Sequence, residues 1–383
     1  MVQIAQAKFC ASQEKLITQI QTLKQLLDNG YSLRNCTLQS LDLRPLKINW
    51  DSFHIENTLF LGCQLEAEEE LSLRRKGAFI YHAPDKLPYD PFRTSLYSWQ
   101  ELLSPTHDGR SRDLAIYEHF SQSRFKPSIN EALWQRLHDH AIDDALRRLL
   151  EYNAEGMTEK RCVAIMGGHS VRRDHPDFAR VVHTAKLLGE AGYFVASGGG
   201  PGIMEAANLG AYLAGQPEQA VSHSLALLAK APHYSDEAYQ KVAQEVLEHY
   251  SDGQKNLAIP TWFYGHEPSN LFASHIAKYF SNSIREDTLL AVALYGIVFA
   301  PGSAGTTQEI FMDAAQNHYA TFNYYSPMVF LGRKRYEIDT MIYPLIRQLS
   351  YGMAYHDLLH LTDEPEEVVN WLRRHEPVMK EGV

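Results

Sequence analysis

The sequence has few cysteines and no long apolar run. Its four cysteines (Cys10, Cys36, Cys63 and Cys162) lie far apart and form no Cys-x-x-Cys pair, so neither a disulfide framework nor a zinc ribbon is predicted. We therefore expect a reducing, cytoplasmic setting. No uncharged apolar run approaches the roughly 18 residues of a membrane helix, so we expect no membrane partner.

Basic residues are also in deficit. The 383 residues carry 36 Lys and Arg against 46 Asp and Glu, a net charge of −10. This argues against nucleic acid as a partner, because neutralising its phosphates takes clustered basic side chains. The chain contains no G-x-x-x-x-G-K-[ST], so it lacks the lysine of a P-loop triphosphatase, and no acidic residue stands where an NAD ribose would need one. No metal or redox cofactor is expected.

The most informative motifs in the sequence are two glycine-rich turns. Residues 197–205 read Ser-Gly-Gly-Gly-Pro-Gly-Ile-Met-Glu, and residues 301–309 read Pro-Gly-Ser-Ala-Gly-Thr-Thr-Gln-Glu. Each follows an apolar strand-like run and opens a helix-like one. Glycine lets a ligand approach the backbone amides, and the start of the following helix presents N–H groups to an anion. Each turn is a candidate phosphate site, although a tight strand-to-helix turn without a ligand would look the same.

From residue 161 onward, strand-like and helix-like segments alternate. Strands are expected at 162–166, 193–197, 257–263, 295–300 and 328–331. Strands separated by helices predict an α/β, doubly wound parallel sheet of the Rossmann-like class, with a ligand crevice at the carboxyl ends of the strands. Both glycine turns stand at such ends. The stretch 270–292 is expected to be helical, with Lys278 on its surface.

The first 127 residues lack this order. Residues 13–28 have apolar side chains at helical spacing, and residues 31–65 carry short apolar pieces typical of a small β-rich or stacked-repeat module without a strict period. A long helix is expected at 128–152. We predict an additional N-terminal α+β region at 1–127, with an accessory or regulatory role, and a Rossmann-like nucleotide-binding domain at 128–383.

The second turn carries the more informative geometry. Glu309 lies four residues after Gly305, one helical turn of roughly 5.4 Å along the same face. If Gly305 and Thr306 hold a phosphate, Glu309 reaches the attached sugar. A carboxylate there can bind ribose hydroxyls, stabilise an oxocarbenium-like centre or position water. The alternative is an acid that merely favours the first helical turn. Arg285, just ahead of the preceding strand, would bring a cation to the same crevice.

A helical arginine, an apolar strand and the motif P-G-G-x-G-T-x-x-E follow one another in the Lonely Guy (LOG) family of nucleoside 5′-monophosphate phosphoribohydrolases. The sequence resembles this hallmark at Arg285, at the apolar strand 294–300 and at Pro301–Glu309. The resemblance spans residues 160–332, and Gly167–Ser170 resembles the family's opening nucleotide loop. Ser303 replaces the second hallmark glycine, Glu286 stands where plant-type members carry lysine, and residues 217–250 look like an insertion. These departures point to a larger bacterial relative that acts on ordinary nucleotides.

The resemblance implies hydrolysis of the N-glycosidic bond of a nucleoside 5′-monophosphate, with Arg285 and Glu309 as catalytic residues. It implies a small-molecule nucleotide as partner, no cofactor, and a homodimer or higher homo-oligomer. The expected substrate-binding residues lie at strand ends and glycine turns: Gly168, His169, Ser170, Gly199, Gly200, Gly202, Glu205, His266, Gly302, Gly305, Thr306 and Thr307. His266 could equally be an ordinary loop residue. The alternative function is non-catalytic binding of a nucleotide or molybdenum cofactor on the same fold.

Overall fold

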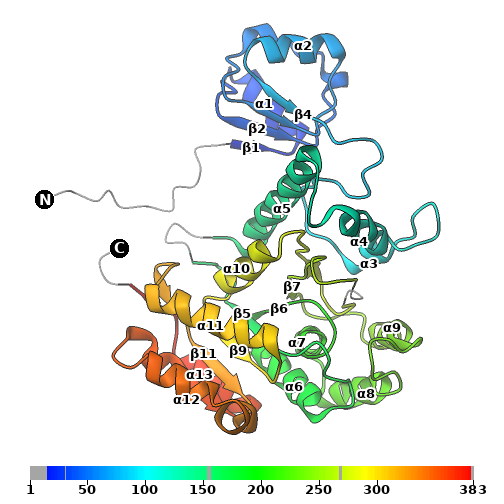
Figure 1. The fold of residues 1–383 in the computed structure, drawn as a ribbon. Helices are drawn as coiled ribbons and strands as arrows, with labels where there is room; N and C mark the ends of the chain where they lie inside the picture. The colour runs from blue at the N-terminus through cyan, green and yellow to red at the C-terminus, as the bar shows by residue number, and fades with distance from the viewer. Residues whose placement is uncertain (1–14, 31, 153–156, 267–269, 381–383) are drawn as a thin grey trace, which may run out of the picture. The chain divides into compact units, whose positions relative to one another are not determined.

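The computed structural model describes residues 15–30, 32–152, 157–266 and 270–380 (Figure 1). The chain divides into two compact units, the first comprising residues up to Ser95 together with Ser121–Leu146 and the second comprising Leu96–Phe120 together with Arg147–Val383. Residues 96–120 therefore belong to the same unit as the C-terminal part. The boundary between residues 127 and 128 stays a prediction about independent folding.

The first unit is built on a parallel sheet. Its strands follow the chain order β1-β2-β3-β4. Lys15 pairs with Cys36, Thr37 with Leu59, and Leu59 with Phe79, so successive strands lie about twenty residues apart and stack like repeats. The elements are β1 (Lys15–Ile17), α1 (Ile20–Asp28), β2 (Cys36–Gln39), β3 (Leu59–Leu61), α2 (Ala67–Arg75) and β4 (Phe79–Tyr81), with short 3₁₀ turns at Arg44–Leu46 and Trp50–Ser52.

The helix predicted at 13–28 is shorter than expected. Its described N-terminal part, Lys15–Ile17, is strand β1, and α1 begins at Ile20. The backbone N–H of Lys15 donates to the Asn35 carbonyl at 3.0 Å, and Ile17 is fully buried. Pairing with β2 therefore overrides the helical spacing of the apolar residues.

In the described part of the second unit, seven strands form one parallel sheet in the order β12-β11-β9-β5-β6-β7-β8. They are β5 (Cys162–Met166), β6 (Phe194–Ser197), β7 (Leu257–Ala258), β8 (His275–Ile276), β9 (Ile297–Phe299), β11 (Met328–Leu331) and β12 (Leu359–Thr362). The chain starts at the centre with β5, runs to the edge at β8, and returns to the other side of β5 with β9. This order confirms the predicted doubly wound α/β fold.

Helices cover both faces of this sheet. Helices α6, α7 and α13 pack together on one face, and α10 packs against β5. From β9 the chain runs to β11 and then to β12, the opposite direction along the sheet to that from β5 to β6 and β7. Because crossovers between parallel strands are right-handed, this reversal places α11 and α12 on the opposite face. The helices of this region are α6 (Pro176–Glu190), α7 (Ile203–Tyr212), α8 (Glu218–Leu228), α9 (Tyr239–His249), α10 (Asn282–Val292), α11 (Ala304–Tyr319), α12 (Ile342–Leu349) and α13 (Pro365–Arg374), and earlier in the chain lie α3 (Trp99–Leu103), α4 (Arg112–Ser123) and α5 (Ile129–Leu150).

Strands buried on both faces read as continuous apolar runs, and every residue of β5, β9 and β11 is buried. This is why the sequence located these strands well. Within the described ranges, no helix combines the length and apolar character needed to span a bilayer. A short antiparallel pair, β10 (Tyr324–Tyr325) with β13 (Val378–Met379), lies outside the seven-stranded sheet, and a π-helical turn at Lys334–Asp339 and a 3₁₀ turn at Ala354–Leu358 flank α12.

The stretch 270–292 is only partly helical. His275–Ile276 forms the edge strand β8, which pairs with Leu257–Ala258, and α10 begins at Asn282. Backbone bonds from Ala277 to Ala258 (2.8 Å) and from Tyr279 to Pro260 (3.0 Å) continue the extended pairing beyond the strand. Lys278 therefore lies in an extended segment and not on a helix surface, which corrects the prediction made for it.

Candidate functional site

Three loops meet at the carboxyl ends of β5, β6 and β9. The N–H of Gly168, after β5, donates to the Pro301 carbonyl, after β9, at 3.0 Å. The N–H of Ile203, which opens α7, donates to the Gly168 carbonyl at 3.1 Å. Because the strand order reverses around β5, this edge is the topological switch point at which doubly wound sheets bind ligands.

Close backbone contacts explain two of the glycines. Gly202 has φ +68°, and a Cβ there would lie 2.5 Å from the Gly168 carbonyl oxygen. A Cβ on Gly302 would lie 2.1 Å from Thr306 Oγ1 and 2.9 Å from the Gly168 nitrogen. Both positions therefore require glycine so that the three loops can join. They shape the site, and neither is among the residues that line the pocket.

A pocket of about 540 Å³ opens over these loops. It takes residues from all three loops and from α10, α11 and the chain after β7 and β8. Of the predicted site residues, eight line it: Gly168, His169, Gly199, Gly200, Arg285, Gly305, Thr306 and Glu309. It is also lined by Gly167, Gly198, Met204, Pro260, Thr261, Tyr264, Gly265, Lys278, Glu286, Ser303, Ala304 and Gln308. The structure thus brings both glycine turns and the Arg285–Glu309 pair into one cavity.

Arg285 and Glu309 face each other from neighbouring helices. Arg285 lies on α10 and is 8% exposed, and Glu309 lies on α11 with 16% of its side chain exposed. Nη1 of Arg285 is 3.5 Å from Oε1 of Glu309. The arginine Nε is buried and has no hydrogen-bond partner among the described residues. The pair is therefore loose, with hydrogen-bonding capacity left for a ligand.

Burial raises the pKa of the Glu309 carboxyl, the Arg285 guanidinium lowers it and the nearby Glu286 carboxylate raises it, which gives a value of about 7. At neutral pH, Glu309 therefore exists in both protonation states. A carboxyl tuned toward neutral pH inside a pocket is a feature of acid–base sites. This electrostatic setting could not be derived from the spacing of the second turn.

Glu286 is a pocket residue that the sequence marked only as a departure from the family pattern. Its carboxylate accepts hydrogen bonds from Asn282 (2.7 Å) and Gln308 (2.9 Å) and contacts the Tyr264 hydroxyl at 3.4 Å. It is 7% exposed. The bond to Gln308 ties α10 to α11, and the three contacts together hold the Glu286 carboxylate in place.

Lys278 is a second missed pocket residue. It is 3% exposed, and its ammonium lies 2.7 and 3.0 Å from the two carboxylate oxygens of Asp113 on α4. A lone lysine in the apolar run Ile276-Ala-Lys-Tyr-Phe280 is the sequence signal that could have shown its burial. Its partner lies 165 residues away in the chain, and no local pattern connects the two.

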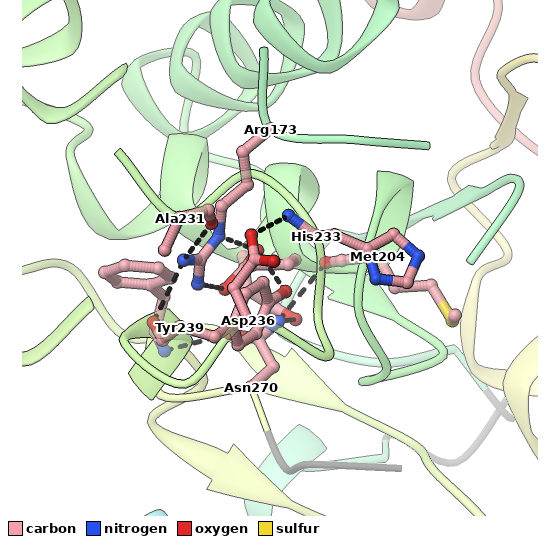
Figure 2. Close-up of polar contacts among 10 residues, drawn as sticks. Arg173, Met204, Ala231, His233, Asp236, Tyr239 and Asn270 are labelled. Carbon is pink, nitrogen blue, oxygen red and sulfur yellow. Dashed lines mark hydrogen bonds and ion pairs between the residues drawn. The ribbon is translucent and has the colours of Figure 1, made fainter. Parts of the chain in front are cut away.

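Glu205 does not line the pocket, and its carboxylate is bound by Arg173. Figure 2 shows Arg173 together with Ala231 and Tyr239. Nε of Arg173 donates to the Glu205 carboxylate at 2.8 Å, and the Tyr239 hydroxyl donates to the same carboxylate at 2.7 Å. Arg173 also donates to the Ala231 and Tyr239 carbonyls at 3.2 and 2.9 Å. Both members of the ion pair are at most 2% exposed. Glu205 is therefore committed to joining α7 with the loop after β5 and with α9.

The remaining predicted residues lie at the margin. Ser170 is exposed, and the Thr307 hydroxyl donates to the Ser303 carbonyl at 3.0 Å. Nε2 of His266 lies 3.5 Å from Asp113 Oδ2. None of these three is among the residues lining the pocket. No group of three or more His, Cys, Asp and Glu side chains suited to a metal ion occurs within the described residues.

No family model and no curated protein matches the sequence. Several solved structures are similar over 56% of this chain. A molybdenum cofactor binding protein from Rippkaea orientalis is 14% identical with a TM-score of 0.36 over 97% of its own length. The Moco carrier protein from Chlamydomonas reinhardtii is 14% identical (TM-score 0.35, 97% covered), and TM1055, a structural genomics target, is 16% identical (TM-score 0.33, 99% covered). Because these identities and TM-scores are low, the fold is assigned from the strand order and register of the sheet itself.

Proposed function

We propose that the chain hydrolyses the N-glycosidic bond of nucleoside 5′-monophosphates and releases the free base and ribose 5-phosphate. The observation that carries the proposal is the Arg285–Glu309 pair, 3.5 Å apart in a pocket that both glycine turns also line. Glycine amides at helix starts suit a phosphate. A carboxylate one helical turn further along α11 suits the sugar.

In this reaction the bond between C1′ and the base nitrogen breaks and its electron pair leaves with the base. Water supplies the new C1′ hydroxyl, and the proton that water loses ends on the base nitrogen. Positive charge develops on the sugar as the bond breaks. The ionised Glu309 would stabilise that charge, as carboxylates do in glycoside cleavage. Arg285 would orient the nucleotide and balance the charge that develops on the leaving base. The LOG-like hallmark at Arg285 and Pro301–Glu309 supports the same assignment.

The direct test is to incubate the protein with a panel of nucleoside monophosphates and to measure the release of free base by chromatography. Because the glycine turns are explained by phosphate recognition, we expect kcat/KM for AMP to exceed that for adenosine by about 100-fold or more, equivalent to about 3 kcal/mol of phosphate binding. Equal values for the two would remove the reason for assigning phosphate to the turns. Nucleotide binding without any base release would favour the non-catalytic alternative, a nucleotide or molybdenum-cofactor binding protein.

Base release should also depend on pH. Because the pKa of Glu309 is raised to about 7 and the ionised form is assigned the stabilising role, we expect kcat/KM for AMP to rise with pH through about 7 and then level off. The measurement is a pH profile between about 5.5 and 8.5 at constant ionic strength. A profile that falls with rising pH would show that the protonated carboxyl is the working form.

A further inference from the structure

Lys278 is a buried cation that lines the pocket, and the reaction proposed above gives it no role. It follows β8, and 4% of its side chain is exposed. Its ammonium lies 5.2 Å from the Trp262 ring and is bound by both oxygens of Asp113. Asp113 is 1% exposed and also accepts a hydrogen bond from the Trp262 indole at 2.8 Å. The lysine is therefore held in a fixed place.

The Asp113 carboxylate stays ionised in this setting. Burial alone raises its pKa, but the Lys278 ammonium and hydrogen bonds from His266 and Trp262 lower it to about 2. An ammonium has three N–H donors, and Asp113 accounts for two short contacts. The described residues offer Lys278 no second acceptor, so one donor remains for a molecule in the pocket. A buried ion pair adds little net stability compared with apolar residues, which favours a functional reason for it.

The position of Lys278 complements that of Arg285. The neighbouring Ala277 is bonded to Ala258 on β7, and a Cβ on Gly199 would lie 2.9 Å from Ala258. Lys278 is thus placed on the side of the first glycine turn, whereas Arg285 is paired with Glu309 on the side of the second. In a nucleoside monophosphate only the phosphate is negatively charged at neutral pH, so a cation that is free to donate selects that group.

We propose that Lys278 is a cationic contact for the phosphate of the ligand, in addition to the glycine amides, and that Asp113 is its positioning residue. The inference rests on the proposed function in taking the ligand to be a phosphate ester. It also gives residues 96–120 a part in the site, since α4 supplies Asp113 from within the predicted accessory region 1–127.

The test is calorimetric titration of the full-length chain with two probes, ribose 5-phosphate and adenosine. Removing only the lysine would leave Asp113 as a buried lone charge, so the main variant is the double change Lys278→Gln/Asp113→Asn, which removes both charges. Its matched control is Lys334→Gln/Asp339→Asn, an exposed pair 2.8 Å apart. We expect the main variant to bind ribose 5-phosphate about 10- to 100-fold more weakly, the range for a lost charged hydrogen bond. Adenosine affinity and the control should stay within about twofold.

Two further variants separate contact from positioning. Lys278→Arg keeps the cation and should retain most of the affinity for ribose 5-phosphate. Asp113→Asn keeps the shape but frees the ammonium, so KM for AMP should rise several-fold with kcat nearly unchanged. A purely structural role would instead lower the amount of folded enzyme and reduce apparent kcat at constant KM.

Unchanged affinity of the main variant for ribose 5-phosphate would overturn the inference, as would an equal loss for adenosine or a wild-type chain that does not bind ribose 5-phosphate. The outcome is separable from that of the proposed function. Weakened ribose 5-phosphate binding by the main variant, with no base release by the wild type, supports the Lys278 contact and rejects the hydrolase. Base release by the wild type, with unchanged ribose 5-phosphate binding by the main variant, supports the hydrolase and rejects the Lys278 contact.

Discussion

Replacing Glu309 by Gln should lower kcat for base release by at least about 10³-fold while leaving the affinity for ribose 5-phosphate within about threefold. Glutamine keeps the size and hydrogen-bonding shape of the side chain but cannot carry the negative charge that opposes the developing sugar cation. A factor of 10³ corresponds to about 4 kcal/mol of transition-state stabilisation. Binding should survive because the phosphate is assigned to the glycine turns and not to Glu309. The measurement combines single-turnover base release with titration of ribose 5-phosphate.

Folding of this variant can be checked independently. Because burial raises the pKa of Glu309 from 4.5 to about 7, its contribution to stability is greatest below the unfolded pKa and is lost as pH rises through about 7. Ionisation in the folded protein therefore costs up to about 3 kcal/mol above that pH. Glu309→Gln should consequently be at least as stable as wild type at pH 8 and similar at pH 4.5, by urea unfolding. Near-normal turnover in such a stable variant would reject the catalytic assignment of Glu309.

The matched control for Glu309 is Glu337, which is also a glutamate but is not among the residues that line the pocket. It is exposed and forms a surface ion pair with Arg333 at 3.7 Å. Glu337→Gln should leave both turnover and stability within the small range of surface substitutions. A comparable loss of activity in both variants would point to a general effect of charge and not to the position of Glu309.

The sequence predicted that Arg285 and Glu309 lie close together because the elements that carry them are neighbours in the chain. Helix α10, strand β9 and helix α11 follow one another in the chain, so a buried strand between the two residues already brings their helices to the same edge. The glycine turns could be predicted from the sequence as well, because a positive φ and a close backbone approach restrict the residue type locally. Local patterns of this kind translate directly into position.

Contacts between distant segments could not be predicted in the same way. Glu205 and Glu309 each end a glycine-rich turn, and nothing in the two local patterns separates them. Arg173 makes the difference, because it binds Glu205 from the loop after β5 while Glu309 faces the loosely held Arg285. The extended segment at Lys278 was missed for a related reason. Strand β8 consists of two residues, too few to outweigh helical propensity in the sequence.

Replacing Arg173 by Met should lower the free energy of unfolding by about 3–5 kcal/mol, because it leaves Glu205 as a buried charge without its cation. The change also removes the hydrogen bonds to the Ala231 and Tyr239 carbonyls and the stacking of the guanidinium 3.4 Å from the Tyr239 ring. The measurement is urea unfolding at pH 7. Arg172→Met is the matched control, since this adjacent arginine is exposed and pairs with Asp174 at 2.8 Å. We expect Arg172→Met to cost no more than about 1 kcal/mol.

The double variant Arg173→Met/Glu205→Leu then decides what Glu205 does. Removing both charges leaves no buried lone ion, so we expect it to recover a large part of the stability lost in Arg173→Met. If Glu205 serves only to join α7 with the loop after β5, the recovered protein should bind ribose 5-phosphate with an affinity within about threefold of wild type, because the glycine amides are retained. If the double variant is stable but binds ribose 5-phosphate at least tenfold more weakly, the Glu205 carboxylate takes part in ligand binding, as its place at the end of the first glycine turn predicts. Stability and affinity measured on the same preparation therefore separate a glutamate that supports the pocket from one that enters it.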